Sequence, residues 1–499
     1  MAANDLTIVV LAAGKGTRLK SDVAKVLHRA GGRPLVEHVV RACQPLAKNI
    51  LVVVGHQAED VRNAIAPLGA STVLQRPQNG TGHAMLIARA AIDPKAGLAI
   101  VLPGDAPLIR TETLQSLLDA HRSGRAAATI LTAQLDNPAG YGRIVRKPDG
   151  SVSAIVEEKS ASVVEGEIRE VNSSIYCFSL DKLWPCLAEL RPDNAHRELY
   201  LTDTIAMLNQ KGDRVLAVEA ADATETFGCN TRAELAEIDR AFRVRKAAAL
   251  MDAGVTIYLP ETVLIDSDVE IAQDTVIEPA VQLLGSTRIG SRCTIQTGSI
   301  LTNATLADNV LVRPHSVITS SVLASRAVVG PFAHLREDAE LRAGARVGNF
   351  VEVKKSVLGE DVKAMHLTYL GDATVGRDTN IGAGTITCNY DGAKKNPTRI
   401  GERVFVGSDS ALVAPITVGD GAYIAAGSTV TEDVPADALA IARGRQVNKP
   451  GWAAARRAKP SERKSAASNT SHPHHDPAKK LPNRPRRKSS ARTKKSRRR

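Results

Sequence analysis

A glycine-rich turn with basic side chains follows the first apolar segment of the chain. Its sequence is Leu11-Ala12-Ala13-Gly14-Lys15-Gly16-Thr17-Arg18, and Lys25 follows seven positions later. Glycine lets the backbone approach an anion closely, while lysine and arginine neutralise phosphate charge. The third glycine of the dinucleotide-binding fingerprint is missing, as is the Gly-Lys-Ser/Thr of a Walker loop. The turn is therefore a candidate phosphate site of another kind.

A second group of candidate residues lies in the C-terminal half, where basic, aromatic and amide side chains accompany one histidine. The group comprises Arg336, Lys354, His366, Tyr369, Asn380, Asn389 and Tyr390. Acyl transfer from a thioester to an amine requires an unprotonated amine. A neutral imidazole, which ordinarily titrates at about pH 6.5, is suited to remove that proton. A lone histidine is more often structural, so its neighbours make His366 a candidate base.

The element that must position this second group has a six-residue period of aliphatic side chains. Three runs show it: Ile265, Ile271, Ile277, Leu283, Ile289, Ile295, Leu301; Val329, Leu335, Leu341, Val347, Val353; and Ile400, Val406, Leu412, Val418, Ile424, Val430. This period is typical of a parallel β-helix, in which short strands stack on their equivalents one coil away. We expect coils from about 254 to 447. Residues 354–375 and 386–399 interrupt the rhythm, and such insertions are expected to form binding loops.

The N-terminal part alternates apolar strands with helical stretches. Candidate strands are Thr7–Leu11, Ile50–Val54, Thr72–Leu74 and Leu98–Leu102, and candidate helices lie near 34–46, 57–66 and 83–92. The alternation predicts a parallel sheet with helices on both faces, whose ligands bind at the carboxyl ends of the strands. Residues 232–250 carry an apolar stripe at helical spacing and predict a connecting helix. The expected divisions are 1–232, a linker helix 233–253, coils 254–452 and a tail 453–499.

Composition places most of the charge in that tail. The chain of 499 residues has a net charge of +12, yet residues 452–499 alone contain 17 Lys/Arg and 2 Asp/Glu. The remainder is slightly acidic, and the tail has too few apolar residues to offset its ordering entropy, which predicts disorder.

The six cysteines are scattered without a CxxC pair, which argues against a zinc site and a disulfide framework. Because the sequence shows no pattern of a signal peptide or a membrane-spanning segment, we expect a soluble, cytoplasmic protein.

Further motifs carry a family resemblance. The turn and Lys25-Val26-Leu27-His28 resemble sugar-nucleotide pyrophosphorylases, and the matches continue through Gln75, Gly80-Thr81-Gly82-His83-Ala84, Gly104-Asp105, Tyr141-Gly142-Arg143, Glu157, Asn172 and Gly228-Cys229-Asn230. With the coils, residues 6–452 resemble the bifunctional N-acetylglucosamine-1-phosphate uridyltransferase/glucosamine-1-phosphate N-acetyltransferase family of bacterial cell-wall synthesis. The resemblance implies an α/β Rossmann-like nucleotidyltransferase domain, a left-handed parallel β-helix of hexapeptide repeats, and a homotrimer.

The resemblance also implies roles in the N-terminal site. A sugar phosphate oxygen attacks the α-phosphorus of UTP in line, so catalysis is alignment plus charge neutralisation. Asp105 and Asn230 would hold Mg²⁺, a cation that prefers few protein oxygens. Arg18 would face the triphosphate and Lys25 the α-phosphate. The implied substrate contacts are Leu11, Ala12, Ala13, Gly14, Gln75, Gly80 and Thr81 for uridine, Pro103 and Gly104 beside Asp105, and Gly142, Glu157 and Asn172 for the sugar.

In the C-terminal site, the resemblance implies that His366 is the base. Arg336, Lys354, Tyr369 and Asn380 would grip the sugar phosphate, and acetyl-CoA would contact Ala383, Asn389, Tyr390, Ser408, Ala426 and Arg443. The chain departs from the family pattern at Pro103, Ser173-Ser174, Glu337-Asp338 and Met365. Met365, directly before His366, is expected to crowd the base.

Three functional hypotheses follow. The leading one is a two-activity enzyme that acetylates glucosamine 1-phosphate with acetyl-CoA and then transfers UMP from UTP to the product. A second is a pyrophosphorylase whose coils serve only to oligomerise it, which the group around His366 argues against. The third makes the basic tail a nucleic-acid-binding segment on a trimeric scaffold, with salt-sensitive binding to phosphates. No membrane partner is expected.

Overall fold

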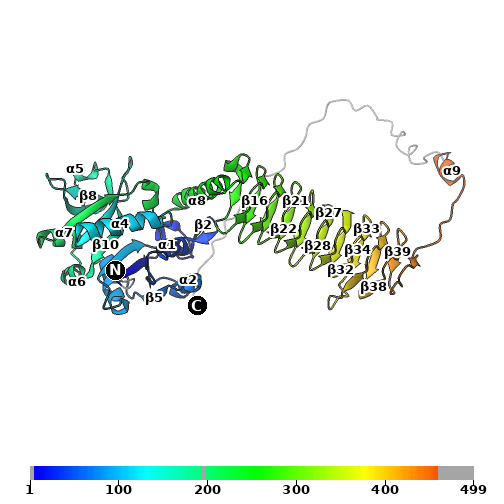
Figure 1. Cartoon of the computed structure of the whole chain (residues 1–499), viewed down its shortest axis with the longest axis horizontal. Helices are drawn as coiled ribbons and strands as arrows, with labels where there is room; N and C mark the ends of the chain where they lie inside the picture. The colour runs from blue at the N-terminus through cyan, green and yellow to red at the C-terminus, as the bar shows by residue number, and fades with distance from the viewer. Residues whose placement is uncertain (1–4, 194–196, 459–499) are drawn as a thin grey trace, which may run out of the picture. The chain divides into compact units, whose positions relative to one another are not determined.

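The computed structural model describes residues 5–193 and 197–458. The chain divides into one compact unit, Met1–Arg443, and a second, Gly444–Arg499. The first unit contains a nine-stranded sheet flanked by helices, followed by three sheets of short stacked strands (Figure 1).

The nine-stranded sheet has the order β11-β7-β10-β6-β1-β4-β5, with β8 paired to β10 and to β9. Its strands are β1 Leu6–Ala12, β4 Asn49–Val54, β5 Ser71–Leu74, β6 Leu98–Pro103, β7 Ala128–Gln134, β8 Gly142–Arg146, β9 Val152–Val156, β10 Glu170–Ser179 and β11 Val215–Glu219. Strand β10 runs antiparallel to both β6 and β7, so the expectation of a purely parallel sheet is wrong and the sheet is mixed. The short strands β2 Arg29–Ala30 and β3 Arg33–Pro34 form a separate hairpin.

Helices cover both faces of this sheet because successive strand residues point to opposite sides. Ile8 and Val10 of β1 pack with α1, α2 and α4, whereas Val9 packs with α3, α6 and α7. The helices are α1 Leu35–Cys43, α2 Ala58–Ile65, α3 Thr81–Ala88, α4 Thr111–Gly124, α5 Val163–Gly166, α6 Leu180–Glu189, α7 Asp203–Gln210 and α8 Arg232–Asp252. Full burial of each aliphatic side chain stabilises the fold by about 1.5–3 kcal/mol.

The C-terminal coils consist of three parallel ladders. The first contains β12 Thr256–Ile257, β15 Val276–Ile277, β18 Thr294–Ile295, β21 Leu311–Val312, β24 Val328–Val329, β27 Arg346–Asn349, β30 Lys363–His366, β33 Asn380–Ile381, β36 Phe405–Val406, β39 Tyr423–Ile424 and β41 Leu439–Ala440. The second contains β13 Leu264–Ile265, β16 Gln282–Leu284, β19 Ile300–Thr302, β22 Val317–Thr319, β25 His334–Arg336, β28 Glu352–Lys354, β31 Tyr369–Gly371, β34 Ile386–Cys388, β37 Ala411–Val413 and β40 Thr429–Val430. The third contains β14 Glu270–Ile271, β17 Arg288–Ile289, β20 Thr305–Leu306, β23 Val322–Leu323, β26 Glu340–Leu341, β29 Val357–Leu358, β32 Ala373–Val375, β35 Thr398–Ile400 and β38 Ile416–Val418.

The aliphatic residues of the six-residue runs are the inward side chains of these ladders, and they form one continuous core. The runs break because the third side of several coils is one residue shorter. Leu306, Leu323, Leu358 and Val375 each follow the preceding inward residue by five positions and are still buried. Residues 354–375 are therefore no insertion, contrary to the sequence-based expectation. They hold β29, β30, β31 and β32 in regular register.

A real departure from the coil occurs between β34 and β35. Equivalent residues Asn380 and Phe405 are separated by 25 positions instead of the usual 17 or 18. The additional segment lies between Cys388 and Thr398 and closes on itself through an antiparallel bridge of Tyr390 with Lys395. This part of the expected interruption at 386–399 thus forms a projecting loop.

Helix α8 lies between the sheet and the coils, within one residue of the expected linker at each end. Its amino end has a capping box in which Thr231 Oγ1 accepts from the Glu234 N–H and the Glu234 carboxylate accepts from the Thr231 N–H. Further along, Asp239 accepts from the Gly31 N–H at 2.8 Å, and Arg243 donates to Asp266 at 3.2 Å. The helix therefore contacts both the β2–β3 hairpin and the first coil.

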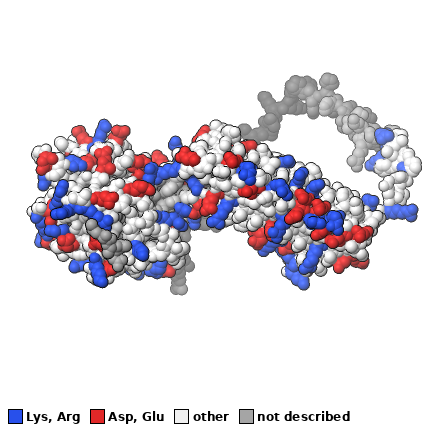
Figure 2. Space-filling view, in the orientation of Figure 1, with Lys and Arg blue, Asp and Glu red and all other residues white. Residues whose placement is uncertain are grey.

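The second unit contains helix α9, Trp452–Ala458, in a stretch for which the composition predicted no order. The rest of the predicted basic tail, 459–499, lies outside the described residues. Acidic and basic side chains are interspersed on the visible surface of the sheet domain and of the coils (Figure 2). Among the described helices, none combines the length and the apolarity needed to cross a membrane.

Candidate active sites

Several N-terminal candidate residues follow the carboxyl ends of parallel strands, where ligands bind in such sheets. The glycine-rich turn follows β1, Gln75 follows β5, and Asp105 lies two residues beyond β6. Pro103, the last residue of β6, is in register with Leu11 of β1. The Gly104 N–H donates to the Leu11 carbonyl at 2.9 Å, which holds the loop of Asp105 against the turn.

At the centre of this site, one ammonium group lies between two oxygen ligands. Lys25 Nζ forms an ion pair with Asp105 Oδ2 and donates to Asn230 Oδ1 at 2.7 Å. Arg18 donates to the same Asn230 oxygen at 2.8 Å. The Cys229 N–H donates to the Asp105 carbonyl at 3.0 Å and so joins the two loops. Residues separated by more than 200 positions thus form one cluster.

Gly16 is required for this arrangement by sterics. Its φ of +62° lies in the left-handed region that favours glycine. A Cβ atom added there would lie 2.5 Å from Lys25 Cβ, a distance that forces displacement. A Cβ at Gly14, in contrast, would meet nothing within 4 Å, so the turn has open space at that point. The turn is therefore closed toward Lys25 and open where a substrate could approach.

The oxygens of Asp105 and Asn230 are a fitting donor set for Mg²⁺. Both already converge on one cationic atom, Lys25 Nζ, which marks a position where positive charge is favourable. A carboxylate and an amide oxygen are hard ligands, and Mg²⁺ keeps several of its waters. The parts of the chain that the structure describes contain no cluster of three or more His, Cys, Asp or Glu side chains suited to a metal.

The side chains assigned to uridine are held by local contacts. Gln75 is buried and donates to the Gly80 carbonyl at 3.0 Å, with His83 Nδ1 3.1 Å from the same nitrogen. Thr81 Oγ1 accepts from the Leu201 N–H at 3.0 Å. The amide of Gln75 therefore contacts both the Gly80 carbonyl and His83, and so holds the loop that begins α3.

The side chains assigned to the sugar lie around β8 and β10. Gly142 and Asn172 are directly opposite in register, and Asn172 donates to the Tyr176 hydroxyl at 2.8 Å. Glu157 accepts from Thr202 at 3.2 Å, and burial raises the pKa of its carboxyl group. Ser174, in the departure from the family pattern, has a φ of +61° where glycine is favoured.

One positioning residue escaped the sequence analysis. A Glu234 carboxylate oxygen accepts from the N–H groups of both Asn230 and Thr231, the latter at 2.8 Å. It therefore fixes the backbone of the residue whose side chain contacts Lys25. The signal was present as Thr231-x-x-Glu234 at the start of a helix, which is a capping box.

In the coils, the candidate residues are arranged by register. Arg336, Lys354 and Gly371 are successive neighbours on the second ladder, so the two basic side chains emerge one coil apart. Arg336 donates to Glu352 at 2.8 Å, and Lys354 pairs with Glu337 at 3.7 Å. Glu337, one of the departures from the family pattern, thus lies beside the basic residue expected to grip phosphate.

His366 ends β30 and is exposed. Its Nδ1 lies 2.9 Å from Asn349 Oδ1, the equivalent position one coil earlier. With this oxygen as acceptor, Nδ1 carries the ring proton and Nε2 keeps its lone pair. Met365 precedes it with a half-buried side chain. In the described residues no hydrogen bond joins His366 to Arg336 or Lys354.

The neighbouring side of the same coil carries Tyr369. Its hydroxyl accepts from Asn389 at 3.4 Å, and Asn389 also donates to Asp372 at 2.6 Å. Tyr390, at the start of the projecting loop, is exposed and donates to the Gly392 carbonyl at 2.7 Å. The buried amide of Asn389 therefore connects Tyr369 to the base of the loop.

The residues assigned to acetyl-CoA follow one corner of the coils. Ala383, Ser408 and Ala426 each lie two positions after an inward residue of the first ladder, on successive coils. The Asp409 N–H donates to the Ala383 carbonyl at 2.7 Å, and Arg443 donates to the Ala426 carbonyl at 2.8 Å. Asn380, in register with Lys363, lies on the ladder of His366.

Both the sheet domain and the coils match families of known proteins. Residues 8–200 match the MobA-like NTP transferase domain family, residues 259–382 the GMPPB C-terminal domain, and residues 397–432 the hexapeptide repeat of succinyl-transferase. The chain is 50% identical over 462 residues to a protein of Koribacter versatilis, covering 92% of this chain and 98% of the relative. A protein of Geobacter metallireducens is 49% identical over 469 residues (90% and 98%), and one of Streptococcus thermophilus 46% identical over 458 (91% and 99%). All three relatives bear the name bifunctional protein GlmU.

Proposed function

The chain belongs to the family of bifunctional GlmU proteins, and from this premise we propose that its two sites divide two transfers between them. It is an enzyme of UDP-N-acetylglucosamine synthesis, with a nucleotidyltransferase and an acetyltransferase activity, and it serves peptidoglycan synthesis. In the proposal, the coils acetylate glucosamine 1-phosphate and the sheet domain transfers UMP from UTP to the product, which also feeds lipopolysaccharide synthesis where that is made.

The convergence of Lys25, Asp105 and Asn230 carries the first half of the proposal. Magnesium held by Asp105 and Asn230 would supply charge neutralisation on the substrate phosphates. Lys25 faces the α-phosphorus, and Arg18 the outgoing pyrophosphate, so that negative charge meets cations placed in advance. The buried Gln75 and Asn172 orient uracil and sugar. The attacking oxygen belongs to the substrate, so the protein needs no nucleophile.

The Asn349–His366 pair carries the second half. Asn349 accepts from the Nδ1–H of His366, which leaves the Nε2 lone pair to take a proton from the amine as the amine attacks the thioester carbonyl; the acetyl group becomes an amide and CoA leaves as the thiol. Arg336 and Lys354 bind the sugar phosphate, which replaces their present carboxylate partners, Glu352 and Glu337. Acetyl-CoA lies along the corner of Ala383, Ser408 and Ala426 in this proposal, and a donor there stabilises the oxyanion.

A homotrimer is part of the proposal. Next to His366, an exposed ladder of side chains occupies one corner of successive coils: His315 stacks on Phe332 with centroids 5.2 Å apart, and Phe332 on Phe350 at 5.6 Å. Leu367 continues the ladder and is 62% exposed. Exposed aromatic rows of this kind favour contact with another protein surface. A second copy placed there would close the acetyl-transfer site. We place the enzyme in the cytoplasm, where its nucleotide and thioester substrates are made.

Separate assays of the two half-reactions test this division. Asp105→Ala should lower uridyl transfer from UTP to N-acetylglucosamine 1-phosphate by about 10²–10³-fold and leave acetyl transfer intact. His366→Ala should lower acetyl transfer by about 10²–10⁴-fold and leave uridyl transfer intact. Each variant is the control for the other. Loss of both activities in one folded variant would contradict the proposal.

A further inference from the structure

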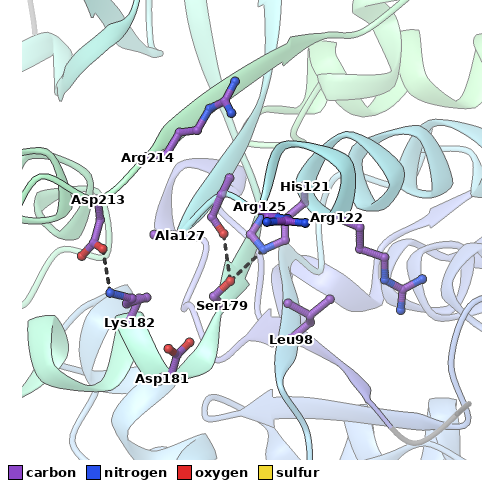
Figure 3. Close-up of a pocket in the computed structure, with 11 residues that line it drawn as sticks. Leu98, His121, Arg122, Arg125, Ala127, Ser179, Asp181, Lys182, Asp213 and Arg214 are labelled. Carbon is purple, nitrogen blue, oxygen red and sulfur yellow. Dashed lines mark hydrogen bonds and ion pairs between the residues drawn. The ribbon is translucent and has the colours of Figure 1, made fainter. Parts of the chain in front are cut away.

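A pocket of about 340 Å³ opens at the ends of three interior strands of the nine-stranded sheet, and Figure 3 shows the residues that line it. Its floor includes Leu98 at the start of β6, Ala127 directly before β7 and Ser179 at the end of β10. Asp105 follows the other end of β6. The length of that strand therefore separates the pocket from the residues proposed to bind UTP.

The polar side chains at the floor hydrogen-bond to one another and to the backbone. The Ser179 hydroxyl donates to the Ala126 carbonyl at 2.8 Å, so the Nε2–H of His121 donates to Ser179 Oγ at 3.1 Å. His121 Nδ1 then accepts from the Thr129 hydroxyl at 3.0 Å. Burial lowers the pKa of His121 to about 4, so the ring is neutral at neutral pH. The floor is a fixed, uncharged platform that leaves recognition to the rim.

The rim is cationic. Four basic side chains line the pocket against two acidic ones, Asp181 and Asp213. Lys182 pairs with Asp213 at 2.8 Å, and Arg214 donates to the Gly124 carbonyl at 3.1 Å. Figure 3 shows these groups around the His121–Ser179 contact. The pocket thus keeps an excess of positive charge after its internal pairs are counted.

Two guanidinium groups supply that excess. Arg122 and Arg125 come from the last turn of α4 and the residue after it, and both are exposed. In the described parts of the chain, neither side chain makes a hydrogen bond or ion pair. Arg125 has a φ of +45°, a left-handed conformation that costs a non-glycine residue about 1–2 kcal/mol. Arg125 therefore occupies a backbone conformation that favours glycine.

We propose that this pocket binds a small phosphorylated anion through the guanidinium groups of Arg122 and Arg125. The planar arginine fork matches phosphate oxygens in a bidentate manner, and both forks are available. Leu98 and Ala127 give the remainder of a phosphate ester an apolar surface. The site does not depend on the two transfers proposed above, because none of its residues lies in either candidate active site.

Titration calorimetry on the full-length protein tests the proposal, with inorganic pyrophosphate as the probe and a chelator in place of Mg²⁺. The test variant is Arg122→Gln/Arg125→Gln. The control is Arg41→Gln/Arg62→Gln, which removes the same charge from α1 and α2, outside the pocket. Wild type and control should bind alike, and the test variant should lose one site per chain or bind there at least tenfold more weakly. Identical isotherms for all three proteins would overturn the proposal.

Crystals soaked in tungstate locate the ion independently of the isotherm. An anomalous peak between Arg122 and Arg125, absent from the test variant, is expected together with the calorimetric difference. A peak without any calorimetric difference would mean an adventitious ion only and would also overturn the proposal. Retention of uridyl transfer by the test variant separates this result from any failure of the proposed function.

Discussion

The two candidate active sites are assembled in opposite ways. In the sheet domain, Lys25, Asp105 and Asn230 come from distant segments and pair with one another in a half-buried cluster. In the coils, Asn349 and His366 are 17 positions apart, on equivalent points of adjacent coils, and face solvent. The first site is closed by long-range loops, whereas the second is an open surface built by repetition. A change in the first should thus disturb a network, and a change in the second should act locally.

Replacement of Lys25 by methionine should be the change that most strongly disturbs the network in the sheet domain. Uridyl transfer should fall by about 10²–10³-fold because a cation aimed at the reacting phosphate is lost. The Mg²⁺ concentration needed for half-maximal activity should not rise, since Lys25 no longer competes for the oxygens of Asp105 and Asn230. Metal titrations of the residual activity measure this, with acetyl transfer as the unaffected control. A steep rise in the Mg²⁺ requirement would make Lys25 an organiser of the metal site instead.

Acid should destabilise the sheet domain before the coils. Burial lowers the pKa values of His38 and His121 to about 4, below the ordinary value of 6.5. The unfolded chain therefore binds more protons between pH 6.5 and 4, and stability falls as the pH falls through that window. The loss is at most about 3 kcal/mol per histidine. The described histidines of the coils are not buried.

We expect the sheet domain and the coils to unfold in two calorimetric transitions, which scans between pH 7 and 4.5 would follow. His121→Asn should flatten the pH dependence of the sheet-domain transition and leave that of the coils unchanged. If both transitions shifted together with pH, the buried histidines would not account for the difference.

Removal of the Asn349 side chain should lower acetyl transfer by about tenfold and alter its pH–rate profile, because the imidazole of His366 loses the acceptor that sets its tautomer. Asn349→Asp keeps an acceptor oxygen and should retain most of the activity. Asn309→Ala, at an exposed coil position that accepts from Arg292, is the matched control. An unchanged pH profile in Asn349→Ala would show that the contact does not position the base.

The smallest effect is expected at Glu234. Glu234→Ala frees the backbone of Asn230 and should raise the Mg²⁺ requirement of uridyl transfer by about threefold to fivefold. Thr231→Ala breaks the other half of the capping box, and should cost about 0.5–2 kcal/mol of stability without this change. An equal rise in both variants would indicate that helix fraying alone is responsible.

The same contrast explains what the sequence could predict. In the coils, the position of a residue in the repeat determines which way its side chain points, so the inward residues could be identified from the six-residue period. The broken rhythm around His366 predicts an insertion, and this prediction is wrong because five-residue sides shift the phase without leaving the coil. Asn349 could have been found from the coil length of 17 residues, once those shorter sides are known. The residue type of Asn349 alone does not distinguish it from other polar residues of the coils.

In the sheet domain, the cluster of Lys25, Asp105 and Asn230 followed from family resemblance, because no local pattern relates positions 205 residues apart. The antiparallel direction of β10 was not predicted either. Strand direction depends on connections and partners, whereas hydrophobic pattern reports only burial. Glu234, in contrast, belongs to a short motif that local rules describe.

The coils also behave as a molecular ruler. Each turn contacts only its two neighbours, so one whole turn added or removed between β17 and β23 would leave every inward residue stacked on an equivalent partner. Such a change would alter the path from α8 to His366 by one strand spacing, about 4.7–4.9 Å. Duplication or deletion of a single turn is thus a route by which evolution or design can set the separation of two chemistries in fixed increments, without redesigning either.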